Sequence, residues 1–130
     1  MVLTDTDHLE LFQAVVGQAP DAIIFADPSG IIRMWNDAAT DIFGYPRDEA
    51  IGQSLDIIIP EHLRCAHWEG FHKAIASGHT SHGSKALRTR ATHRTGQQLY
   101  VTLAFSVING KQGNAFGAMA TARKADDGKP

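Results

Sequence analysis

Hydrophobic residues change their spacing along the chain, and each change predicts a different kind of element. Near the N-terminus, Leu9, Phe12 and Val16 recur three and four positions apart, which is the spacing of an apolar stripe along a helix. Thr4 or Asp5 stands where its side chain can cap the first turn of that helix. The pattern therefore predicts an amphipathic N-terminal helix.

Two continuous apolar runs follow, residues 21–26 and 31–35, with the sequence Asp-Pro-Ser-Gly between them. Proline presets the φ angle of a turn and glycine accepts a positive φ, so the two runs predict a β-hairpin. A helical segment comes next and covers residues 37–43. It begins after the capping side chain of Asn36 and ends at Gly44.

The second half of the chain contains the longest helical pattern and then three strand-like runs. The helical pattern covers residues 61–77 and is followed by Gly78. The strand-like runs are residues 84–90, 98–108 and 115–122, and short glycine-containing loops separate them. Consecutive strands joined by short loops favour an antiparallel sheet with helices on one face, which is an α+β arrangement.

Composition narrows the class of protein. The chain has 130 residues, of which 43% are hydrophobic and 20% charged, and this is ordinary globular usage for one domain. Its single cysteine, Cys65, excludes an internal disulfide framework and a four-cysteine zinc site. A net charge of −2 lacks the excess of positive charge that is typical of nucleic-acid-binding domains. No apolar run approaches the ~20 residues that span a bilayer. The acidic N-terminus lacks the basic segment of a secretory signal. We therefore expect a cytoplasmic protein.

Residues 22–55 carry a series of short motifs in a fixed order. They are D-x-x-G at 27–30, N-x-A-A at 36–39, F-G-Y at 43–45 and E-x-x-G at 49–52. With the three strands after the long helix, this series resembles a PAS domain, and the resemblance covers residues 14–122. It implies a five-stranded antiparallel sheet in the order 2-1-5-4-3, with helices that enclose a cavity. It also implies a sensor or dimerisation module rather than an enzyme.

The same resemblance divides the chain into three parts. We assign residues 1–18 to a dimerisation helix, residues 19–123 to the PAS sensor domain, and residues 124–130 to a disordered tail. Pairing of two copies through the N-terminal helix is expected, because its apolar stripe lies outside a sheet that is already covered. The homodimer would relay a signal to an output domain whose identity the sequence does not give.

The long helix carries the candidate site. Leu63, His67 and Phe71 are four positions apart and form one apolar stripe, which predicts that His67 faces inward. A neutral imidazole on an inward face either finds a hydrogen-bond partner, as core histidines commonly do, or coordinates something. Residues 60–71 (PEHLRCAHWEGF) resemble the corresponding helix of the haem-binding, FixL-like gas-sensor branch of the PAS family. In that branch a P-E/P-x-x-R-x-x-H pattern ends in the iron ligand, so the resemblance implies that His67 is the proximal ligand of haem b.

The part of the pocket that would face the bound gas differs from the same part in the oxygen-binding relatives. Where those relatives place an arginine that reaches the bound gas, this chain has Leu87. Leu103 and Phe105 are expected to complete an apolar lining, while Arg88 should face the other side of the sheet because strand side chains alternate. A pocket with few donors would not favour O₂ over CO or NO. We therefore expect a sensor of a diatomic gas or of redox state.

Three alternatives stay open from the sequence. The domain can be a cofactor-free module for dimerisation or signal relay, or it can bind a flavin or a small organic ligand, with Trp35 or Trp68 as stacking partners. The N-C-R-F-L-Q motif of the flavin-photochemistry branch is absent. Metal-binding residue types also share one face of the long helix, although such a face is more often simply solvated. They are His62, Cys65, Glu69 and His72. No catalytic constellation is present.

Overall fold

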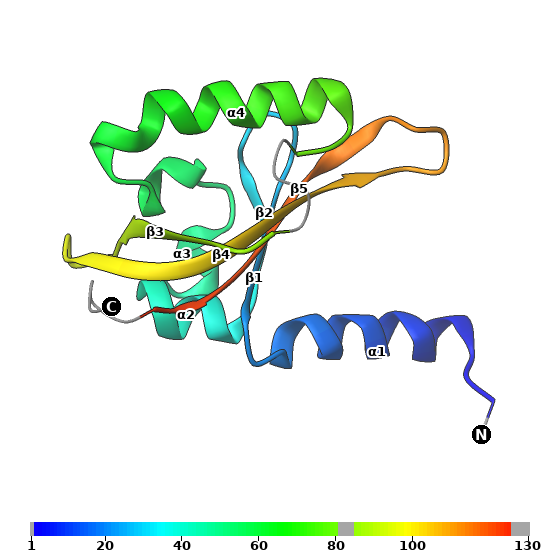
Figure 1. Ribbon diagram of the computed structural model, residues 1–130. Coiled ribbons are helices and arrows are strands. Elements are labelled where there is room, and N and C mark those ends of the chain that lie inside the picture. The colour runs from blue at the N-terminus through cyan, green and yellow to red at the C-terminus, as the bar shows by residue number, and fades with distance from the viewer. Residues whose placement is uncertain (1, 81–84, 126–130) are drawn as a thin grey trace.

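The structure, a computed structural model, describes residues 2–80 and 85–125. Its centre is one antiparallel sheet with the strand order β2-β1-β5-β4-β3 (Figure 1). The five strands are β1 (Ala22–Ala26), β2 (Ile32–Trp35), β3 (Leu87–Thr92), β4 (Gln98–Asn109) and β5 (Ala115–Lys124). This result confirms the predicted α+β class and the predicted strand order.

The helices precede the sheet or connect β2 to β3. They are α1 (Asp5–Gln18), α2 (Asp37–Phe43), α3 (Arg47–Ala50), the 3₁₀ turns η1 (Leu55–Ile58) and η2 (Glu61–Leu63), and α4 (Arg64–Ser77). The sequence predicted one helix over 61–77, and the structure divides that segment at Leu63. The division follows Pro60, whose carbonyl accepts a hydrogen bond from the Leu63 N–H at 2.9 Å and so closes a tight 3₁₀ turn.

The first strand after α4 is displaced from its predicted position. The sequence placed it at 84–90, of which Ser84 lies outside the described residues, whereas β3 runs from Leu87 to Thr92. Pairing with β4 explains the shift. Thr92 lies opposite Gln98, so the two strands remain paired up to a short turn. Register with a neighbouring strand is a tertiary property that local composition does not encode.

The core lies between the inward face of the sheet and the connecting helices. Alternate residues of the central strands are buried there, together with Phe43 of α2 and Phe71 of α4. On β5 the inward residues are all alanines: Ala118, Ala120 and Ala122. Because alanine is short, this strand leaves space beneath α4.

Asn36 joins the N-terminal elements to one another. Its side-chain oxygen accepts hydrogen bonds from the backbone N–H groups of Ile23 (2.8 Å) and Ala39 (3.1 Å). Its amide donates to the carbonyls of Val16 (2.8 Å) and Asp21 (3.0 Å). This one side chain therefore caps α2 and fixes both the end of α1 and the start of β1.

Helix α1 projects away from the rest of the protein in Figure 1. A capping box between Thr4 and Asp7 begins it, and none of its residues is buried. Two of the residues in the predicted stripe are largely exposed, Leu9 at 59% and Phe12 at 63%. The helix ends at Gln18, because Pro20 disfavours helical backbone at Ala19.

The folded C-terminal strand continues past the predicted domain boundary at residue 123. Lys124 is the last residue of β5, and the Ala125 N–H donates to the Tyr100 carbonyl at 2.9 Å. The predicted tail of residues 124–130 is therefore wrong for Lys124 and Ala125. Residues 126–130 lie outside the described part of the chain. Within that part, no helix has the length and apolar character needed to cross a bilayer.

Candidate ligand-binding cavity

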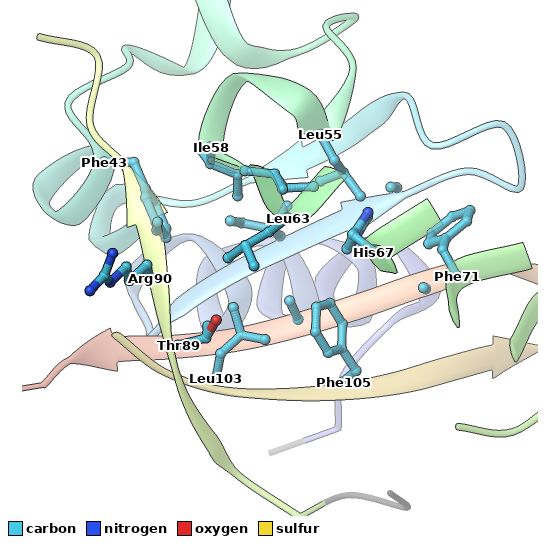
Figure 2. A pocket seen from close by; sticks show the side chains of 16 residues that line it. Phe43, Leu55, Ile58, Leu63, His67, Phe71, Thr89, Arg90, Leu103 and Phe105 are labelled. Atoms are coloured by element: carbon cyan, nitrogen blue, oxygen red, sulfur yellow. The ribbon is translucent and has the colours of Figure 1, made fainter. Parts of the chain in front are cut away.

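Two adjoining pockets lie between α4 and the inward face of the sheet. The first, which we call the core pocket, has a volume of about 130 Å³ and reaches Ile24, Phe43 and Ile58 (Figure 2). The second, the edge pocket, has a volume of about 290 Å³ and extends to Lys85 and Leu87. The two pockets share part of their lining: His67, Phe71, Thr89, Leu103, Phe105 and Ala118.

His67 stands where the two pockets meet. Figure 2 shows its ring directed from α4 into the core pocket. Its Nδ1 atom is buried without a hydrogen-bond partner, and no described residue bonds to either ring nitrogen. Burial lowers the pKa of His67, an effect that the Asp56 carboxylate opposes and His72 reinforces. His67 is therefore a neutral imidazole facing an apolar cavity, which is the protonation state that can coordinate a metal.

Side chains on either side of His67 fix the rotation of α4. Arg64 donates to the Ile59 carbonyl at 3.1 Å and to the Asp56 carbonyl at 3.2 Å. The Trp68 indole N–H donates to the Asp56 carboxylate at 2.7 Å. The Trp68 ring also packs against Gly30, where a Cβ atom would collide with the ring and where φ is +81°. These contacts hold α4 against η1 and Gly30. They fix the rotation of the helix that directs His67 into the cavity.

The structure brings all six predicted site residues to this cavity. Phe71, Leu103 and Phe105 line both pockets with His67. Leu63 lines the core pocket from the end of η2, immediately before α4 begins. Leu87 lines the edge pocket and remains 39% exposed.

Arg88 lies on the opposite face of the sheet from this cavity. Its guanidinium carbon is 4.4 Å from the centre of the Tyr100 ring, which is a cation–π contact. The position agrees with the alternation expected from the sequence, and it leaves the edge pocket without an arginine from this part of β3.

Several lining residues were not predicted from the sequence. Ala118 and Ala120 on β5 create space in the cavity, and their period of two was a usable signal. Ala66 and Gly70 on α4 create space in the edge pocket, and these two residues are four positions apart. Lys85 also lines the edge pocket, and nothing in the pattern of an isolated lysine before a strand could have indicated this.

The metal-binding residue types on the other side of α4 remain in solvent. His62, Cys65, Glu69 and His72 are exposed. Glu69 forms a 3.6 Å ion pair with Lys73. Within residues 2–80 and 85–125, no three His, Cys, Asp or Glu side chains are grouped so that they could hold a metal ion. This face is a solvated helix surface.

Comparison with known proteins establishes the family. Residues 10–125 match the PAS fold family, and the chain belongs to it. Domains of this fold are generally sensor modules rather than enzymes. Among solved structures, a PAS domain from Colwellia psychrerythraea superimposes with a TM-score of 0.78 at 22% identity, covering 92% of this chain and 98% of that chain.

Curated relatives match only part of the chain. The sensor protein FixL of Bradyrhizobium diazoefficiens is 40% identical over 55 residues, which are 42% of this chain and 11% of that protein. The cell-division control histidine kinase PdhS of Brucella anthropi is 31% identical over 72 residues, which are 55% of this chain and 7% of that protein. The chain thus corresponds to a small fraction of these relatives.

Proposed function

We propose that this protein is a PAS sensor domain that binds haem b through His67 and detects a diatomic gas or redox state. The observation that carries the proposal is the buried, unpartnered Nδ1 of His67 at the junction of two apolar pockets. A buried polar atom without a partner is uncommon and costs free energy, and coordination of iron by that nitrogen would offset the cost. The match of residues 60–71 to the haem-binding branch of the family supports the same residue.

The chemistry of the cavity fits haem. Its walls are apolar, and none of the described residues that line it is acidic. Leu63 and Phe71 would hold the macrocycle beside His67. Haem supplies a redox-active iron with a coordination position for a gas.

On the gas side, Leu87, Leu103 and Phe105 form an apolar lining that offers no hydrogen-bond donor. Thr89 adds one hydroxyl to this lining. A hydroxyl is a neutral donor and stabilises a developing negative charge less than a guanidinium does. The lining thus favours CO and NO, which depend less on such a donor than O₂ does.

The absorption spectrum of the protein mixed with hemin tests this proposal. We expect a Soret band that saturates at one hemin per chain. Flavin absorption in the purified protein would instead support a flavin-binding PAS domain. A colourless protein that takes up no hemin would support a cofactor-free interaction module. Either of these outcomes contradicts the haem proposal.

We also propose that two copies pair through α1 and relay the signal to an output domain of a longer protein. The support is the exposure of Leu9 and Phe12 on a helix with no buried residue. Exposed apolar surface of this kind marks an interaction site. Two relatives are a sensor protein and a histidine kinase, which is consistent with an output domain in a longer protein.

Removal of residues 1–18 tests the dimer. We expect sedimentation to show a dimer for the full chain and a monomer for the shortened chain. The double variant Leu9→Glu, Phe12→Glu should give the same result without shortening the chain, while Glu10→Gln on the same helix serves as the control. A full chain that is monomeric at high concentration would contradict this part of the proposal.

A further inference from the structure

The charges that line the cavity are all positive. Among the described lining residues, the permanently charged ones are Arg90 at the core pocket and Lys85 at the edge pocket, and no carboxylate accompanies them. An apolar cavity with this charge distribution fits a ligand that has an apolar body and an anionic end, because a buried carboxylate needs a cationic or hydrogen-bonding partner.

Arg90 is already engaged on the other side of the sheet. Its Nε–H donates to the Tyr100 hydroxyl at 3.1 Å, and its guanidinium carbon lies 5.4 Å from the centre of the Tyr100 ring. Figure 2 shows the guanidinium directed away from the cavity. The part of Arg90 that lines the core pocket is therefore its backbone and aliphatic stem.

Lys85 is exposed, as Arg90 is, but differs from it in its contacts. It forms no ion pair with any residue in the described part of the chain. It lines the edge pocket together with Thr80 and Leu87, and the remaining lining is largely apolar. A lysine at such a position can lay its aliphatic stem along the apolar wall and keep its ammonium group at the water boundary.

We propose that Lys85 binds a carboxylate of the ligand at the mouth of the edge pocket. This inference rests on the proposed haem function, in which the carboxylate is one of the two haem propionates. The apolar macrocycle would occupy the cavity beside His67, and its charged substituents would face solvent. Lys85 lies at that boundary and has no ion-pair partner among the described residues. The lysine would then contribute to affinity through a charge-assisted hydrogen bond and would select the end of the ligand that points outward.

Hemin titration of paired variants tests this inference, with the Soret band as the readout. Lys85→Met keeps the length of the apolar stem and removes the charge. Lys111→Met makes the same change in the turn between β4 and β5, at an exposed lysine outside the two pockets. Hemin dimethyl ester, which has no free carboxylate, is titrated in parallel.

We expect Lys85→Met to weaken hemin binding about two- to fivefold, the range of an exposed charge pair, and to leave binding of the dimethyl ester unchanged. Lys111→Met should match the unchanged protein with both ligands. The preference for hemin over its ester should also fall with added salt in the unchanged protein but not in Lys85→Met.

The other outcomes overturn the inference and separate it from the proposed function. Equal hemin affinity for the unchanged protein and Lys85→Met would reject the role of Lys85 while haem binding stands. An equal loss with Lys85→Met and Lys111→Met would also reject it, because net charge alone would explain the effect. Absence of a Soret band with the unchanged protein would reject both proposals.

Discussion

Asn36 and His67 are both polar side chains set among apolar neighbours, but they differ in how far their hydrogen-bonding groups are satisfied. Asn36 is 3% exposed and makes four hydrogen bonds, which join α1, β1 and α2. His67 lies in the wall of a cavity, and its buried Nδ1 has no partner among the described residues.

This difference separates a structural group from a candidate functional one. A fully bonded buried amide stabilises one arrangement of the backbone, because each donor and acceptor around it depends on that side chain. An unpartnered imidazole contributes no such bond and lowers the stability of the ligand-free protein. Asn36 therefore stabilises the fold, whereas His67 is a candidate for binding a ligand.

The largest expected effect on stability belongs to Asn36. Asn36→Ala should lower the free energy of unfolding by about 3 kcal/mol, since it removes the cap of α2 and leaves buried backbone groups without partners. His67→Leu should change it by less than about 1 kcal/mol, or raise it. Urea unfolding followed by circular dichroism measures both. Similar losses for the two variants would contradict the comparison.

A smaller effect is expected at the gas side of the cavity. Leu87→Arg should slow the conversion of the ferrous protein to the ferric form in air about tenfold, because a guanidinium donor stabilises partial negative charge on the gas. Thr102→Arg provides the control. Thr102 neighbours Leu103 on β4, so its side chain lies on the opposite face of the sheet. If both variants slow the reaction equally, Leu87 does not face the gas.

The smallest effect is a pH dependence of stability. Burial lowers the pKa of His67 below its ordinary value of 6.5. As the pH falls below about 6.5, the unfolded chain binds a proton that the folded protein does not, so unfolding becomes easier. Stability is therefore retained above this pH and lost below it, down to the lowered pKa of the folded state.

His67→Leu should remove this contribution. The free energy of unfolding, measured at pH 7.5 and 5.5, should fall less in the variant than in the unchanged protein. His62→Leu, on the exposed side of the same segment, should behave as the unchanged protein does. A pH dependence that survives in His67→Leu would show that the imidazole is not held in its neutral form.

Much of the fold could be predicted because its signals are local. The cap at Asn36, the stop at Gly44 with φ of +85°, and the turn at 27–30 each involve a few neighbouring residues. The position of His67 on an inward helix face followed from spacing alone. The family resemblance added the strand order, which no local pattern contains.

The features that the sequence did not predict depend on tertiary packing. The shift of β3 to Leu87–Thr92 follows from its register with β4. The cavity volume results from short side chains on two elements that are distant in sequence, Ala118 and Ala120 on β5 and Gly70 on α4. The position of Lys85 at the pocket mouth is a tertiary feature that no sequence motif specifies.

Hemin titration of His67→Ala tests the central claim most directly. We expect a loss of affinity of at least about 100-fold, together with an altered Soret band, because the variant lacks the iron ligand. Added imidazole should restore part of the spectrum by occupying the vacated space. His62→Ala and His72→Ala should titrate as the unchanged protein does, since both side chains are exposed. If His67→Ala retains hemin with an unaltered spectrum, His67 is not the ligand and the account is wrong.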